Sequence, residues 1–173
     1  MFRFLAIALF VSLAAAAQTS APADVPASLK PPATERLLLQ AHAIGVQIYT
    51  CSAAPDGKFS WTLKGPRADL RDSTGKMIIT HSAGPKWQHN DGSFVTGKVT
   101  AKENSPDANS IPWLLLAANS AQSDVGALGN VSFIQRIHTD GGQPPATGCD
   151  AGHKGDETQS NYSADYIFYA PKH

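Results

Sequence analysis

The residue types best suited to chemistry gather in one stretch, residues 81–97. This stretch contains His81, His89 and Asp91, whose imidazole and carboxylate groups are ligands that a divalent transition metal prefers. The metal signal is weak, because the sequence contains neither His-x-His nor His-Glu-x-x-His. The alternative is that His89 and Asp91 are loop residues, with Asp91 shaping the turn before Gly92 through an Asx hydrogen bond.

Two further side chains indicate ligand contact rather than catalysis. Trp87 lies between the two histidines, so we predict a ring that faces a ligand, although a tryptophan is also an ordinary core anchor. Arg136 on a strand is able to bind a carboxylate ligand through two hydrogen bonds, or to pair with an acid such as Asp69 or Asp165. No catalytic residue is predicted, since the nucleophile motif Gly-x-Ser-x-Gly is absent. The candidate ligand-binding residues are His81, Trp87, His89, Asp91 and Arg136.

The elements that must position these residues are short β-strands. Runs of alternating apolar and polar residues recur along the chain, and turns rich in Gly, Pro, Asn and Asp separate them. The clearest run, residues 46–51, places Val46 and Ile48 on one face and Gln47, Tyr49 and Cys51 on the other. We count about nine or ten such strands and find no amphipathic helix, which predicts an all-β single domain, either a sandwich or a barrel of antiparallel strands.

The N-terminal region has the features of an export signal. Residues 1–17 contain Arg3, an apolar core of about 10 residues and a small-residue cleavage site, which together are typical of a secretory signal peptide. The apolar core is too short to span a bilayer. Residues 18–33 are rich in Ala, Ser and Pro and predict an extended, poorly ordered lead-in. A single β domain then follows over residues 34–173, and we expect a periplasmic or secreted protein.

Charge and cysteine content limit the possible partners. The chain has 14 basic and 14 acidic residues, and this balance gives no basic face for nucleic acid. It has two cysteines, Cys51 and Cys149, and in an exported protein such a pair is expected to form a disulfide. No motif calls for a cofactor, and no segment is predicted to span a membrane. We therefore expect a small-molecule or carbohydrate partner.

The order of motifs resembles a family of secreted bacterial and fungal proteins that is classified as a domain of unknown function. The resemblance covers nearly all of the predicted domain and implies export and one compact fold, but no reaction. The motifs that carry it are GVQIYTC (45–51), HSAGPKW (81–87), DGS (91–93), IPWLLL (111–116), IQR (134–136) and YxAxYxFY (162–169).

These observations favour a non-enzymatic ligand-binding or surface-interaction module. One alternative is a metal-dependent hydrolase or oxidoreductase that uses His81, His89 and Asp91. Another is a structural envelope or stress protein, which would have no concave pocket near Trp87.

Overall fold

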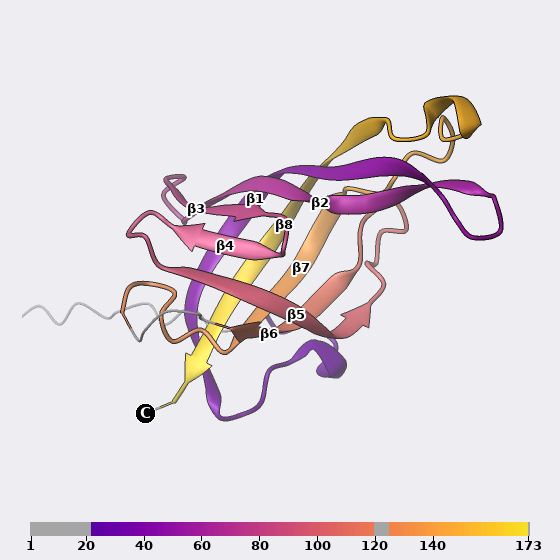
Figure 1. Ribbon diagram of the computed structural model, residues 1–173. Coiled ribbons are helices and arrows are strands. Elements are labelled where there is room, and N and C mark those ends of the chain that lie inside the picture. Colours follow the sequence, from indigo (N-terminus) through magenta and orange to yellow (C-terminus); the bar gives the residue numbers. More distant parts are fainter. Residues whose placement is uncertain (1–21, 120–124, 173) are drawn as a thin grey trace, which may run out of the picture.

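The alternating segments form strands of a single sheet that closes on itself. The computed structural model describes residues 22–119 and 125–172, and within them it contains eight strands, two short 3-10 helices and no α-helix. Each strand pairs antiparallel with the next, and β8 pairs back with β1, so the sheet is a closed barrel (Figure 1). The predicted all-β domain is confirmed, as the barrel of the two expected architectures. The elements are η1 (Ala27–Leu29), β1 (Glu35–Ala53), β2 (Phe59–Arg71), β3 (Met77–Ser82), β4 (Lys86–His89), β5 (Phe94–Glu103), β6 (Trp113–Asn119), β7 (Phe133–Gly141), η2 (Ala151–His153) and β8 (Glu157–Pro171).

The strands are fewer and longer than the predicted nine or ten, because Gly45 and Gly65 lie inside strands instead of between them. Strand β1 has 19 residues and β2 has 13. At Gly45 the two strands approach so closely that an added Cβ would lie 2.2 Å from the carbonyl oxygen of Arg67. Gly65 has a φ of 151°, and a Cβ there would lie 2.6 Å from the Cβ of Ala83. These glycines, with a register shift after Ile48, let the long strands bend around the barrel.

Small and large side chains alternate across the barrel interior. On β1, Ala41 lies opposite Tyr166 of β8, and Gly45 lies opposite Tyr162. The small residues leave the room that the aromatic rings fill, which is how narrow barrels reach close packing. The largest fully buried side chains of the inner cluster are Trp87, Tyr166, Phe168, Leu70, Ile79, Leu128 and Ile134.

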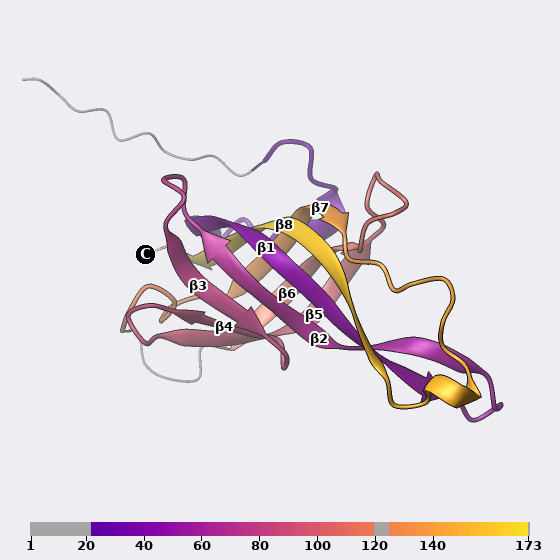
Figure 2. The same cartoon turned by 90° about the horizontal axis from the view of Figure 1, so that it is seen from above.

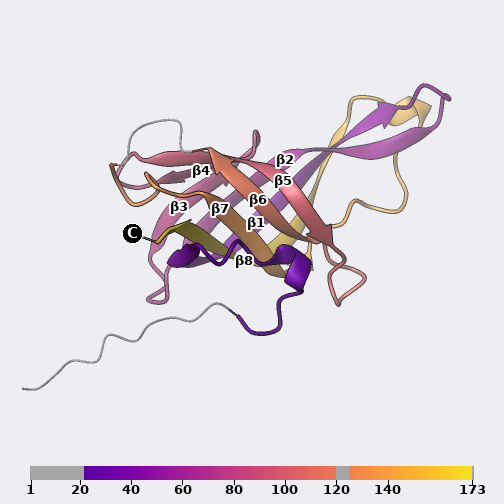
Figure 3. The same cartoon turned by 90° about the horizontal axis from the view of Figure 1, so that it is seen from below.

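A second cluster lies on the outside of the barrel, under the N-terminal segment. Residues 22–33, the described part of the predicted lead-in, are not loose: Leu29 is 0% exposed and Val25 is buried. They cover outward-facing residues of β6, β7 and β8, and Figure 3 shows this segment running along the barrel wall. The side-chain amide of Gln135 donates a hydrogen bond of 2.7 Å to the Leu29 carbonyl. The folded domain therefore begins before the predicted start at Thr34.

The disulfide lies in an arm that extends from the barrel, where it ties the loop before η2 to β1. Strands β1 and β2 continue beyond the barrel as a hairpin arm, accompanied by η2 and the start of β8 (Figures 1 and 2). Cys51 in this arm is bonded to Cys149 in the loop before η2, which confirms the predicted pairing. Beside the disulfide, the indole N–H of Trp61 donates to the Thr147 carbonyl at 2.9 Å.

The predicted signal peptide, residues 1–17, lies outside the described residues. Over residues 22–119 and 125–172, no helix has the length and apolar character needed to cross a membrane.

Candidate functional site

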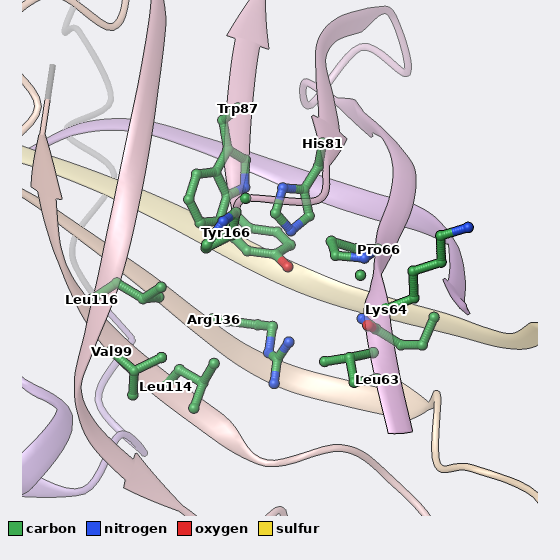
Figure 4. Close-up of a pocket in the computed structure, with 14 residues that line it drawn as sticks. Leu63, Lys64, Pro66, His81, Trp87, Val99, Leu114, Leu116, Arg136 and Tyr166 are labelled. Carbon is green, nitrogen blue, oxygen red and sulfur yellow. The ribbon is translucent and has the colours of Figure 1, made fainter. Parts of the chain in front are cut away.

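One end of the barrel interior holds a cavity of about 290 Å³, to which all eight strands contribute at least one residue. The cavity opens where the β3–β4 hairpin ends, since the pairing of β2 with β3 stops at Arg67–Ser82 and that of β4 with β5 stops at Lys86–Thr96. The labelled lining residues in Figure 4 are Leu63, Lys64, Pro66, His81, Trp87, Val99, Leu114, Leu116, Arg136 and Tyr166.

His81 and Trp87 meet in this cavity because the β3–β4 hairpin pairs them directly. Their rings stack with centroids 4.3 Å apart and an interplanar angle of 7°, and Tyr166 meets both rings edge-on. His81 Nδ1 lies 2.9 Å from the Lys86 carbonyl oxygen, so Nδ1 carries the proton and Nε2 remains an acceptor. Burial lowers the pKa of His81 from 6.5 to about 4, which keeps the ring neutral at pH 7.

Arg136 reaches the same cavity from β7, where its register partners are Leu114 and Tyr166. Its Nε and Nη2 donate to the Pro112 carbonyl at 3.3 and 2.8 Å. Over the described part of the chain, no carboxylate forms an ion pair with Arg136, and no Asp or Glu lines the cavity. The predicted alternative of an acid partner on the sheet is not realised.

The two predicted acid partners of Arg136 are turned elsewhere. Asp165 bonds instead to His42 and His138, at 2.7 and 2.8 Å. Asp69 is exposed, and it follows inward-facing Ala68 on β2. The other cation of the cavity lining, Lys64, pairs with Glu157. Arg136 is thus the cavity cation that no acidic side chain neutralises in the described residues.

Three buried polar groups of the cavity lining have no hydrogen-bond partner among the described residues. They are Gln47 Nε2, Trp87 Nε1 and the Tyr166 hydroxyl. The side chains of all three residues are almost completely buried. A buried polar atom without a partner destabilises a fold by about 1–3 kcal/mol, so such atoms are rare unless something else binds them. Figure 4 shows the Tyr166 hydroxyl, the His81 ring and the Arg136 guanidinium directed toward the same space.

His89 and Asp91 do not join this group. They stand in the β4–β5 turn, where Asp91 Oδ1 accepts hydrogen bonds from the Ser93 amide and hydroxyl at 2.9 and 2.6 Å. These bonds, with one from the Ala127 amide, hold the pKa of Asp91 far below its ordinary value. Asp91 therefore shapes its turn and ties it to the loop at Ala127, as the alternative interpretation expected.

The metal hypothesis fails on this geometry. His81 points into the barrel, whereas His89 and Asp91 bond to each other at 3.0 Å in the turn. Within residues 22–119 and 125–172, no group of three or more His, Cys, Asp or Glu side chains is placed to hold a metal ion. The set of His81, His89 and Asp91 is accordingly not a metal site.

The sequence interpretation missed Gln47 and Tyr166. The apolar face of residues 46–51 is not the buried one: Gln47, Tyr49 and Cys51 are buried, whereas Val46 and Ile48 are partly exposed. A usable signal was present, because a bonded cysteine is normally buried and Cys51 shares its face with Gln47. Tyr166 had no such signal, since its proximity to Arg136 depends on the pairing of β7 with β8.

Comparison with known proteins places the chain in a family without adding an activity. No curated protein and no solved structure matched the sequence. One family model matched, and it spans nearly all of the barrel, in agreement with the motifs from Gly45 to Tyr169. The chain belongs to the family described as Protein of unknown function (DUF3455), whose model covers residues 32–170.

Proposed function

We propose that this protein is a non-enzymatic binding protein that holds one small molecule with an apolar body inside its barrel. The observation that carries the proposal is the cavity of about 290 Å³ whose lining includes three buried polar groups without partners. Ligand sites are typically concave and mostly apolar, with a few convergent polar groups, and the mouths of β-barrels are a common place for them. A ligand would supply the hydrogen bonds that the described residues leave unmade.

The entrance of the cavity supports an apolar ligand. Leu63 and Val99 both line it, and they are 54% and 47% exposed. They are two of only four large apolar side chains that are strongly exposed in the described residues. Exposed apolar side chains gathered at an opening are typical of a binding surface. A carbohydrate fits less well, because Trp87 is buried and His81 covers one face of its ring.

The competing hypotheses receive less support. A purely structural envelope protein was expected to have no pocket near Trp87, whereas Trp87 lines this cavity. A metal-dependent hydrolase or oxidoreductase needed His81 beside His89 and Asp91, and these side chains lie apart.

We also propose that the protein works in the periplasm or outside the cell. The apolar N-terminal run and the Cys51–Cys149 disulfide both support this location, because disulfides persist in oxidising compartments. The mass of the protein recovered from the periplasm or medium should match a chain beginning at Gln18. Recovery of the full-length chain from the cytoplasm alone would contradict this location.

Binding of the neutral dye N-phenyl-1-naphthylamine, which fluoresces in apolar surroundings, tests the proposed function. We expect saturable binding with one site per chain. The variant Val99→Trp should weaken it at least about 10-fold by blocking the mouth, which corresponds to about 1.4 kcal/mol. The matched variant Ile44→Trp places the same ring at another strongly exposed apolar position, outside the cavity, and should bind like wild type. Absence of saturable binding, or equal effects of the two variants, would refute the proposal.

A further inference from the structure

Resting on the proposed function, we infer that the ligand is an organic monoanion: an apolar body with one carboxylate group, which Arg136 binds. The inference comes from the charge of the cavity. Its lining contains two cations, Arg136 and Lys64, and no Asp or Glu. Lys64 is already paired with Glu157, so one positive charge remains for a ligand. In surroundings of low dielectric, an uncompensated charge is costly and an opposite charge is strongly favoured.

The hydrogen-bonding geometry of Arg136 leaves donors for this anion. Its Nε and Nη2 both donate to one acceptor, the Pro112 carbonyl. Over residues 22–119 and 125–172, no acceptor is bonded to Nη1. Two more donors without partners line the same cavity, Gln47 Nε2 and the Tyr166 hydroxyl. A carboxylate only accepts hydrogen bonds and has about four sites for them, so it suits a group of donors from a guanidinium, an amide and a hydroxyl.

A shared acceptor is possible because the three donors line one cavity. Arg136 on β7 is the direct register partner of Tyr166 on β8. Gln47 on β1 pairs with Ser160, further along β8, and reaches the same cavity from there. A second cavity of about 220 Å³ adjoins the first, and both are lined by Gln47 and Arg136. Arg136 therefore stands between the two spaces, with Leu63 and Leu114 also common to both.

The number of charges and the size of the cavity restrict the ligand further. A phosphate monoester carries nearly two charges at pH 7, and one unpaired guanidinium balances only one. An apolar cavity of about 150 Å³ holds one benzene molecule, so a cavity of about 290 Å³ has room for a body about twice as large. A carboxylate with a chain of about ten carbons, or with a fused pair of rings, satisfies both limits. Decanoate and its neutral analogue decan-1-ol are therefore a suitable pair of probes.

The test measures how well decanoate and decan-1-ol displace N-phenyl-1-naphthylamine at pH 7.5. In wild type we expect decanoate to bind about 10- to 100-fold more tightly than decan-1-ol, the range for a hydrogen bond to a charged group. Arg136→Met should bring the two affinities together, and Arg136→Lys should keep part of the preference as a point charge. Arg67→Met removes a guanidinium that bonds to Gln159 outside the cavity, and it should keep the full preference.

The outcomes separate this inference from the proposed function. If decan-1-ol displaces the dye and decanoate is no tighter, the monoanion inference is overturned while the binding function stands. A preference for decanoate that survives Arg136→Met, in protein with wild-type thermal unfolding, also overturns it. If Arg136→Met does not fold, a reduced preference in Arg136→Lys without loss of decan-1-ol binding supports the inference, and an unchanged preference counts against it. If the dye itself does not bind, both proposals fail.

Discussion

The tyrosine hydroxyls on the two faces of strand β8 differ in their hydrogen bonding. On the outer face, Tyr169 donates to Gln135 Oε1 at 3.1 Å, and Gln135 in turn donates to the Leu29 carbonyl. On the inner face, the hydroxyls of Tyr162 and Tyr166 have no partner among the described residues. The outer hydroxyl is thus bonded within the protein itself, although the indole N–H of Trp113 in the same outer cluster has no partner among the described residues. The inner face retains hydrogen-bonding capacity that the fold does not use, which is the property expected of a binding site.

Two histidines show the same contrast in their protonation. Outside the barrel, His138 lies between Asp165 and Asp24, with ring nitrogens 2.8 and 2.9 Å from their carboxylate oxygens. Partial burial alone would lower the pKa of His138, but the hydrogen bonds and charges of both carboxylates outweigh it and raise the pKa. Inside, burial lowers the pKa of His81. The barrel wall thus separates a histidine with a raised pKa, whose two ring nitrogens both pair with carboxylates, from a neutral histidine with an open acceptor.

The largest expected effect is on stability, where a leucine of the outer cluster is compared with a leucine at the cavity mouth. Leu29 is 0% exposed under the outer cluster, so Leu29→Ala should lower the free energy of unfolding by about 2–5 kcal/mol. Leu63 is 54% exposed at the cavity mouth, so Leu63→Ala should change it by less than about 0.5 kcal/mol. Urea unfolding at pH 7 measures both. A loss below 1 kcal/mol for Leu29→Ala would show that the N-terminal segment does not close the outer face.

The next effect is acid destabilisation by His81. The unfolded chain takes up a proton on this residue near pH 6.5, whereas the folded chain resists until about pH 4. Stability is therefore complete above pH 6.5 and falls as the pH drops toward 4, by about 3 kcal/mol in total. His81→Gln does not titrate but keeps an amide donor for the Lys86 carbonyl. The loss in unfolding free energy between pH 7 and pH 4 should be smaller in this variant than in wild type. An equal loss would show that His81 does not contribute to acid destabilisation.

Two Tyr→Phe variants on β8 compare the effect of removing one hydroxyl from each face of the strand. Tyr169→Phe removes a donor from buried Gln135 and should lower the free energy of unfolding by about 1–2 kcal/mol. Tyr166→Phe removes a hydroxyl without a partner and should leave stability unchanged within about 0.5 kcal/mol, while weakening decanoate binding. Thermal and urea unfolding measure the stability of the two variants. If Tyr166→Phe is the more destabilising of the two, the inner hydroxyl has a structural partner and the contrast is lost.

Much of the fold was predictable from local patterns, and the errors have identifiable causes. Alternation and turn residues were enough to predict an all-β domain, since these signals extend over a few residues. The strand count failed at Gly45 and Gly65, because a glycine that permits close strand approach looks the same in sequence as one that ends a strand. The packing of Leu29 was hidden for a similar reason: the composition of its segment is typical of disorder, and only the outer faces of β6, β7 and β8 give it a partner.

The residues of the candidate site also differ in how far they could be predicted from local sequence. His81 and Trp87 were found because their contact lies within one hairpin, where sequence spacing determines the pairing. Arg136 was found as a residue type, but its lack of an acid partner depends on where Asp165 and Asp69 point, which a single strand does not reveal. Tyr166 joins it through the pairing of β7 with β8, and Gln47 through the closure of the barrel around one cavity. Contacts of that range are set by the closed sheet and not by any one segment.

The smallest expected effect is the alkaline response of the outer histidine. A raised folded pKa means that the stabilisation by protonated His138 is complete below pH 6.5 and is lost as the pH rises through the raised value. Asp24→Asn removes one of the two carboxylates and should lower the pKa of His138 while leaving that of His81 unchanged. Titration of the imidazole protons by NMR measures the pKa of both residues in one experiment. We expect His138 to titrate above pH 6.5 and His81 well below it. If both titrate on the same side of 6.5, the pKa values of the two histidines are not shifted in opposite directions, and the electrostatic contrast between the two faces is refuted.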